Sequence, residues 1–345
     1  MKGVIFAKVG AEPKIVEDLQ KPSPGPDQLL VKSIWVAINP VDSFMAGYGL
    51  LVVGWPLVLG VDAAGIVLEA GSEAASKYGF KAGDHVFGCT RLGVPGYAAG
   101  QEYFLMDASV TIPKPKNISL LEAVTLGVGS ETACLALFDG LDVPLPDPKN
   151  LPGPRDEWII ILGGASSVGK CAIQLAKASG YKVAASCSTK SAAEVKGMGA
   201  VTFDYKKPIE EQVKEVVDIT SGEISRIFDA VAAENPITAK ELFKASKSDR
   251  RLFATTNDWS GIGDFEGAKT YGVKLGGIGR PEAAALNEKI EAYIPVITAL
   301  IAAGKLAPAE YEVIGTGFEA AIKAYEHQRS GAGGSRKVVV KIQDE

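Results

Sequence analysis

The sequence predicts an α/β protein built from two domains, one rich in β-strands and one containing a doubly wound parallel sheet. A chain of 345 residues suits about two domains. Its first third reads as short strands broken by glycine and proline turns, whereas its middle alternates buried strands with amphipathic helices. A last strand-like run at residues 337–342 has no helix after it, so it is expected to join the β-rich domain. We therefore expect a discontinuous first domain, residues 1–123 and 304–345, and a second domain, residues 124–303.

Extended segments separated by turn residues predict the strands of the first domain. They lie at residues 3–9, 14–18, 28–38, 65–70, 84–88, 98–106 and 109–112, with a loop between 70 and 84. From Ser119 the pattern becomes helical, because Ser119 and Glu122 have the spacing of a capping box ahead of an apolar run.

A glycine-rich turn is the strongest local signal in the second domain. Residues 159–162 suit a strand that is buried on both faces, and residues 168–178 have the apolar spacing of a helix. Glycines between them would allow a sharp bend, a close approach to a pyrophosphate, and tight packing of helix on strand. The residues expected to form this cofactor turn are Gly163, Gly164, Ala165, Ser166, Ser167, Val168 and Gly169. Their spacing differs from G-x-G-x-x-G, so an ordinary strand-to-helix turn stays open as an alternative.

Strands and helices alternate beyond this turn, as a doubly wound sheet requires. Strands are expected at residues 182–186, 200–203, 226–231, 251–255 and 270–275, and helices at 191–198, 209–220, 237–245 and 282–303.

Composition excludes several classes of function. The net charge of -5, with both signs interspersed, offers no basic field for nucleic acid and no polybasic membrane segment. The four cysteines lie far apart, which argues against a zinc ribbon or a disulfide framework. With His85 and His327 as the two histidines, a histidine-based triad or multi-histidine metal site is not expected. No run approaches the roughly 20 apolar residues of a membrane span and no signal peptide is evident, so we expect a cytoplasmic protein.

Several motifs together resemble one known family. They are Asn39-Pro-x-Asp42 with Gly47-Tyr48, the run from Leu59 to Gly65, Gly83-Asp-His-Val-Phe-Gly88, the glycine turn, Gly199-Ala200 with Asp204-Tyr205, and the glycine-rich turn before the last strand. Over nearly its whole length the chain resembles the medium-chain dehydrogenase/reductases, in particular their zinc-free quinone oxidoreductase and enoyl reductase branch. The proline-rich loop at 143–157 and residues 255–257 are most similar to fungal enoyl reductases that work as separate proteins beside polyketide synthases. The resemblance implies a GroES-like catalytic domain, a Rossmann cofactor domain, and either a homodimer or a monomer.

Zinc-dependent members of this family have metal ligands that the sequence lacks. They carry a cysteine near the position of Asn39, and Gly-His-Glu where this chain has Gly60-Val61-Asp62. A valine cannot bind a metal ion, and the cysteine-rich lobe of those relatives is absent too. The resemblance therefore implies no metal site, so that hydride transfer relies on a polar donor or on protein dipoles.

The end of the second strand of the cofactor domain favours NADPH. An NAD site usually has an acidic residue about 20 residues beyond the glycine turn, where it binds the ribose 2′-hydroxyl. This chain has no carboxylate there, and Ser186, Ser188, Thr189 and Lys190 can instead bind a 2′-phosphate. Similar quinone reductases hold that phosphate with a lysine and a tyrosine at the positions of Lys190 and Tyr205. A solvated surface lysine and a packing tyrosine remain the alternatives.

Two threonines are further candidates for cofactor binding. By resemblance, Thr132 matches a threonine that contacts the nicotinamide ribose, although the usual Leu-Thr-Ala is Glu131-Thr-Ala133 in this chain. Thr255, at the end of an expected strand, is included among the cofactor residues.

The reacting end of the cofactor is expected in a crevice at the carboxyl edge of the parallel sheet. By resemblance, Asn39, Asp42, Tyr48 and Thr132 lie around it, and the Tyr48 phenol could protonate or polarise the enolate formed by hydride addition. The alternative for Tyr48, a tyrosine beside a glycine, is a packing or surface residue. Asn39 and Asp42 have a structural alternative, because an Asn-Pro turn closed by an aspartate is a device in its own right. The fungal relatives have a lysine where this chain has Phe44, so their substrate and mechanism cannot be transferred wholesale.

Three functions remain open from the sequence. The first is an NADPH-dependent reductase of an activated C=C bond in a small enone or an enoyl thioester, including a carrier-bound thioester. The second is an NADPH-dependent quinone reductase, and the third is an NADPH-binding protein without catalysis. The shape and polarity of the substrate slot would separate them.

Overall fold

The computed structural model describes residues 1–232, 235–257, 262–263 and 265–345, which divide into two compact units. Unit 1 comprises Met1–Val128, Leu275–Thr298 and Pro308–Glu345, and unit 2 comprises Gly129–Lys274 and Ala299–Ala307. The sequence assigns residues 275–298 to the second domain, whereas the structure groups them with unit 1. The reason is local, since Arg280 donates hydrogen bonds to the carbonyl oxygens of Leu51 and Leu92.

Unit 1 contains two largely antiparallel sheets. The smaller has the order β2-β1-β4, with β1 at Gly3–Phe6, β2 at Lys14–Val16 and β4 at Leu57–Val58. The larger has seven strands in the order β15-β16-β3-β5-β6-β8, with β7 paired to β3. Their bounds are β3 Gln28–Ile38, β5 Asp62–Ala70, β6 His85–Cys89, β7 Tyr103–Asp107, β8 Ile112–Pro113, β15 Tyr311–Thr316 and β16 Lys337–Lys341.

Two sequence-based predictions for unit 1 are confirmed. The last strand, β16, pairs antiparallel with β3, with Val339 opposite Ala37, because its apolar residues complete the core of the larger sheet. The capping box is also present: Ser119 Oγ accepts a hydrogen bond from the Glu122 backbone N–H, and the Ser119 N–H donates to the Glu122 carboxylate.

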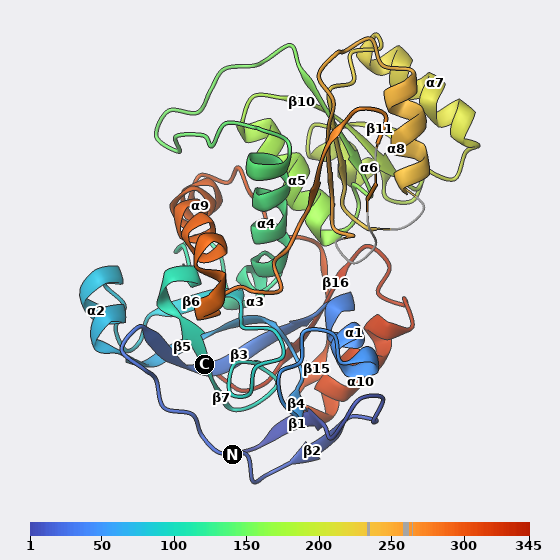
Figure 1. Ribbon diagram of the computed structural model, residues 1–345. Coiled ribbons are helices and arrows are strands. Elements are labelled where there is room, and N and C mark those ends of the chain that lie inside the picture. Colours follow the sequence, from blue (N-terminus) through green and yellow to red (C-terminus); the bar gives the residue numbers. More distant parts are fainter. Residues whose placement is uncertain (233–234, 258–261, 264) are drawn as a thin grey trace. The chain divides into compact units, whose positions relative to one another are not determined.

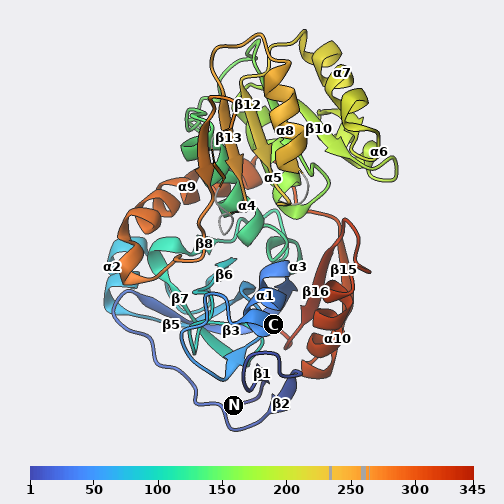
Figure 2. The ribbon, with the colours of Figure 1, turned by 45° about the vertical axis from the view of Figure 1, so that its right-hand side comes forward.

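The helices of unit 1 are α1 Pro40–Tyr48, α2 Ser72–Tyr78, α3 Leu120–Ala123 and α10 Phe318–Arg329, together with the 3-10 turns η1 Ala108–Val110 and η3 Pro281–Ala283. The prediction of a loop between 70 and 84 was wrong, because α2 is a short helix with one buried residue, Ala74, and so has little apolar periodicity. The sequence reading also missed β15 and α10, which pack beside β16 (Figure 2). A signal for α10 existed: Phe318, Ala321 and Tyr325 have helical spacing and are buried.

Unit 2 contains a six-stranded, fully parallel sheet. Its order is β11-β10-β9-β12-β13-β14. The strands are β9 Trp158–Leu162, β10 Lys182–Cys187, β11 Val201–Asp204, β12 Arg226–Asp229, β13 Leu252–Thr255 and β14 Lys269–Gly272. The helices are α4 Gly127–Cys134, η2 Leu135–Gly140, α5 Ser167–Ala178, α6 Ala192–Gly197, α7 Ile209–Thr220, α8 Asn235–Lys244 and α9 Ala284–Ala302, of which α4 and α9 are divided between the units.

The strand order of unit 2 reverses between β9 and β12, as the sequence-based prediction of a doubly wound sheet requires. Helices α7 and α8 lie side by side (Figure 1) and cover an apolar core that includes Phe203, Val216, Leu242, Phe243 and Phe253. In such sheets, ligands bind beyond the carboxyl ends of the strands that flank the reversal. No helix of the described part of the chain has the length and apolar character needed to cross a bilayer.

Candidate functional site

The glycine turn between β9 and α5 is shaped by close packing. Gly163 adopts a φ of 84°, a left-handed conformation that favours glycine. A Cβ on Gly164 would lie 2.8 Å from the Cβ of Ala185 on β10, and one on Gly169 would lie 2.3 Å from the Gly163 carbonyl oxygen. The three glycines therefore permit the bend and the contact of the turn with β10 and α5.

Two serine hydroxyls hold this turn. Ser166 Oγ donates to the Gly163 carbonyl at 2.8 Å and accepts from the Gly169 N–H at 3.0 Å, which caps α5. Ser186 Oγ accepts from the Gly163 N–H at 2.8 Å and is 1% exposed. Among the described residues, the N–H groups of Ser167 and Val168 have no protein acceptor recorded, so the first turn of α5 can receive an anion.

The other candidates near β10 differ in exposure. Lys190 is exposed, Tyr205 is 51% exposed and Ser188 is partly exposed, so all three are accessible from solvent. Ser186, by contrast, is buried within the turn, which makes Ser188 and Lys190 the better candidates for contact with a 2′-phosphate. Phosphate binding by any of them stays a prediction.

The two threonine candidates are both buried. Thr255 Oγ1, at the end of β13, donates to Asp229 Oδ2 at 2.8 Å and accepts from the Asn257 N–H at 3.1 Å. This hydroxyl therefore ties the ends of β12 and β13 together. Thr132 lies in α4 and is 7% exposed. A cofactor contact of either threonine stays a prediction.

In unit 1, Asp42 closes the Asn-Pro turn at the start of α1. Its carboxylate accepts from the backbone N–H of Asn39 at 2.8 Å and from that of Gly60 at 3.1 Å. Burial raises the pKa of Asp42 to about 6, although the two backbone donors and the Lys337 ammonium act in the opposite direction. The structural alternative for Asp42 is thus present in the fold, and a catalytic role stays a prediction.

A buried ion pair that the sequence reading missed lies against the same turn. Lys337 Nζ, at the start of β16, is 2.8 Å from Asp62 Oδ2 and donates to Asn39 Oδ1 at 2.6 Å. The Asn39 amide nitrogen donates in turn to Asp62 Oδ2 at 3.3 Å. We call Asn39, Asp42, Asp62 and Lys337 the buried polar cluster. The available signal was a charged residue at the start of each of two strands, Asp62 in β5 and Lys337 in β16.

Tyr48 is separate from the buried polar cluster. It is the last residue of α1 and is 81% exposed, with its ring 6.4 Å from that of Phe44. Of the three predicted catalytic residues, the structure therefore brings Asn39 and Asp42 together and leaves Tyr48 on the surface.

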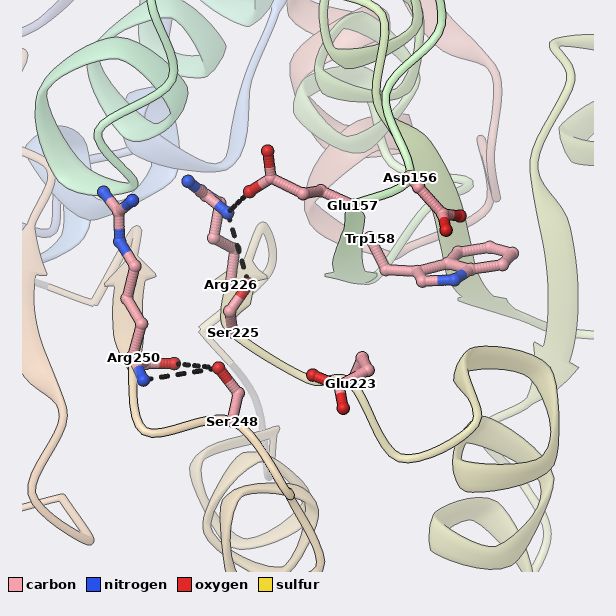
Figure 3. Close-up of a pocket in the computed structure, with 8 residues that line it drawn as sticks. All are labelled: Asp156, Glu157, Trp158, Glu223, Ser225, Arg226, Ser248 and Arg250. Atoms are coloured by element: carbon pink, nitrogen blue, oxygen red, sulfur yellow. Dashed lines mark hydrogen bonds and ion pairs between the residues drawn. The ribbon is translucent and has the colours of Figure 1, made fainter.

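A pocket of about 200 Å³ lies at the amino ends of β9, β12 and β13, at the opposite edge of the sheet from the glycine turn. In this pocket the Arg226 guanidinium faces Glu157 and Ser225 (Figure 3). Its Nη1 lies 2.7 Å from Glu157 Oε2. Arg250 pairs with Asp142 at 3.1 Å. Because both cations already have partners, this pocket does not suit a dinucleotide phosphate. Within the described residues, no group of three or more histidines, cysteines or carboxylates is arranged to hold a metal ion.

Comparison with known proteins places the chain in a family. Residues 25–116 match the alcohol dehydrogenase GroES-like domain. The trans-enoyl reductase tazE of Aspergillus terreus is 34% identical over 220 residues, which cover 62% of this chain and 71% of that protein. The chain belongs to the medium-chain dehydrogenase/reductase family. Its resemblance to the enoyl reductase branch, inferred from motifs, is thereby confirmed.

Other family members extend the likeness. The trans-enoyl reductase milB of Cordyceps militaris is 33% identical over 231 residues, 66% of this chain and 63% of that protein, so the match spans less than two thirds of that relative. An alcohol dehydrogenase superfamily protein from Novosphingobium aromaticivorans has a crystal structure that matches with a TM-score of 0.81 at 25% identity, covering 99% of this chain and 100% of that one. This chain therefore has the expected fold, a GroES-like domain with a Rossmann-type domain.

Proposed function

We propose that this family member is an NADPH-dependent, zinc-independent reductase that transfers a hydride to an activated C=C bond of an enone or enoyl thioester. Two similar proteins, milB and tazE, are named trans-enoyl reductases, which supports this substrate class. NADPH, when bound, supplies the hydride.

The observation that carries the proposal is the position of the Lys337 ammonium. It contacts Asn39 and Asp62, which lie in the two motifs where zinc-dependent relatives have metal ligands. The neighbouring Val61 is apolar and 1% exposed. A zinc ion at this place would meet a buried positive charge and an unsuitable ligand set, so activation of an alcohol or carbonyl by zinc is disfavoured. Reduction of a conjugated C=C bond needs only a hydrogen-bond or proton donor for the enolate.

The residues of unit 2 fit a dinucleotide. The first-turn amides of α5 can bind a pyrophosphate, and the segment after β10 offers Ser188 and the exposed Lys190 to a 2′-phosphate. The segment from Ala184 to Lys190 contains no carboxylate that would repel this phosphate.

Tyr48 is the proposed proton donor. No hydrogen bond to its phenol oxygen is recorded within the described part of the chain, and its 81% exposure leaves the hydroxyl open to a substrate. The phenol can therefore donate to the enolate oxygen or α-carbon as negative charge develops there.

The test follows NADPH oxidation by the full chain against enones, enoyl thioesters and quinones. We expect turnover with an enone or thioester, and a loss of about a hundredfold in kcat for Tyr48→Phe, the size of a general acid contribution. Tyr311→Phe, which changes another exposed tyrosine of unit 1, is the matched control and should leave kcat unchanged. Turnover with quinones alone would favour a quinone reductase, and tight NADPH binding without any turnover would favour a binding protein.

A further inference from the structure

The loop that follows Tyr48 has a strained backbone. Leu51 adopts a φ of 64°, in the left-handed region that a large side chain rarely occupies. Such a conformation persists where surrounding contacts fix it, and it is concentrated at functional sites. We call residues 49–53 the acceptor loop.

Arg280 holds this loop. Its Nη2 donates to the Leu51 carbonyl oxygen at 2.8 Å and to the Leu92 carbonyl oxygen at 2.6 Å. The guanidinium side chain is 15% exposed, and Glu282, at 4.0 Å, is its ion-pair partner at the limit of contact. Charge-assisted bonds from a largely buried guanidinium are strong, so Arg280 ties the acceptor loop to the segment between β6 and β7.

Two glycines allow close packing around Leu51. We call Arg280, Gly93 and Gly276 together the clamp. A Cβ on Gly276 would lie 2.8 Å from Leu51 Cδ1, and one on Gly93 would lie 2.4 Å from the Leu51 carbonyl oxygen. The Val53 N–H also donates to the Gly93 carbonyl at 3.0 Å. The backbone of Arg280 is also held, because the Asn287 side-chain amide donates a hydrogen bond to the Arg280 carbonyl oxygen at 2.9 Å.

Exposed apolar and aromatic side chains lie in the acceptor loop and just before it. Tyr48 precedes the loop and is 81% exposed, Val53 is 61% exposed, and Phe44 on the preceding helical turn is 36% exposed. The sequence has no charged residue between Asp42 and Asp62. An apolar group would bury these side chains favourably, whereas a charged group would find no charged partner among residues 43–61.

We propose that Arg280 is a positioning residue that fixes the acceptor loop so that it binds an apolar chain attached to the reacting C=C bond. This inference rests on the proposed function, since it names the polarity of the acceptor for the same reaction. Arg280 acts through Leu51 and does not itself touch the acceptor.

The experiment compares crotonyl and dodecenoyl N-acetylcysteamine thioesters as acceptors for wild type, Arg280→Met and Arg280→Lys. For Arg280→Met we expect KM to rise about tenfold with the dodecenoyl thioester and by a clearly smaller factor with the crotonyl one, with KM for NADPH unchanged. In Arg280→Lys, an ammonium that reaches one of the two carbonyls should restore part of the loss. Arg329→Met, at an exposed arginine of α10, is the matched control and should match wild type.

A second readout does not depend on turnover. Hydrogen exchange of the Val53 and Val52 amides should be faster in Arg280→Met than in wild type. The Val53 N–H donates to the Gly93 carbonyl oxygen and the Val52 N–H to the Gly49 carbonyl oxygen, and both bonds depend on the loop conformation that Arg280 holds. Equal KM changes for both thioesters, or unchanged exchange of these amides, would overturn the role of Arg280. Absence of turnover in wild type with both thioesters and with the enones rejects the proposed function, and that result is distinct from a failure of the variants to differ.

Discussion

Lys337 and Asp62 form an ion pair of 2.8 Å in which both side chains are buried, 4% and 0% exposed. The pair joins the start of the last strand to the start of β5, across the Asn39 carboxamide. Asp62 Oδ1 also accepts from the Val128 N–H at 3.2 Å. Each of these buried charges is stable in the fold only while its partner is present, because a single buried charge without a counter-charge lowers the free energy of unfolding.

Removing the cation should therefore destabilise the fold. For Lys337→Met we expect the free energy of unfolding, measured by urea denaturation, to fall by about 3–5 kcal/mol, because the Asp62 carboxylate is left buried and unpaired. Lys341→Met is the control on the same strand, since Lys341 pairs at the surface with Asp344 and should cost less than about 1 kcal/mol. Equal losses in the two variants would show that the buried pair has no special weight.

Asp42 should make stability depend on pH. Its pKa of about 6 in the folded state lies above the ordinary 3.8, so the folded state binds a proton more tightly than the unfolded state. The stability it contributes is present below about pH 4 and is lost as the pH rises through 6, by roughly 3 kcal/mol in total. Urea denaturation at several pH values should show this fall for wild type relative to Asp42→Asn, which lacks the titrating group. Parallel stability curves for the two proteins would mean that Asp42 keeps its ordinary pKa.

Lys190 should decide between the two nicotinamide cofactors. For Lys190→Ala we expect KM for NADPH to rise about tenfold, the effect of losing one charge-assisted hydrogen bond, and KM for NADH to change little. Lys196→Ala removes another exposed lysine, on α6, and should leave both values unchanged. A rise of equal size for NADPH and NADH would contradict recognition of a 2′-phosphate by Lys190.

Gly169 should be intolerant of any side chain. In Gly169→Ala the new Cβ would approach the Gly163 carbonyl oxygen to 2.3 Å and the Gly164 Cα to 2.9 Å, and neither is the end of a flexible side chain. We expect a loss of about 1–3 kcal/mol in the free energy of unfolding and weaker NADPH binding, measured by fluorescence titration. Gly197→Ala, where a Cβ meets nothing within 4 Å, is the control and should be neutral or stabilising. Unchanged NADPH binding in Gly169→Ala would show that the turn can shift at no cost.

The sequence by itself determined the elements whose patterns are local. The apolar run of β9 with its glycine turn, the capping box at Ser119, and the alternation that builds the parallel sheet can all be read over a few residues, because strand burial, caps and bends depend on near neighbours. The apolar pattern of β16 also fixed its membership of the β-rich sheet, since a strand without a following helix needs an existing edge to pair with.

The tertiary structure decided which polar residues meet. Asn39 and Lys337 are separated by 298 positions in the chain, and their contact exists because β16 pairs with β3. In the same way, Ser186 accepts a hydrogen bond from the Gly163 N–H and Arg280 donates one to the Leu51 carbonyl oxygen. No local sequence pattern predicts either contact. The physical reason is that a buried charge or hydroxyl is stable wherever the fold supplies a partner, and the partner can come from any part of the sequence.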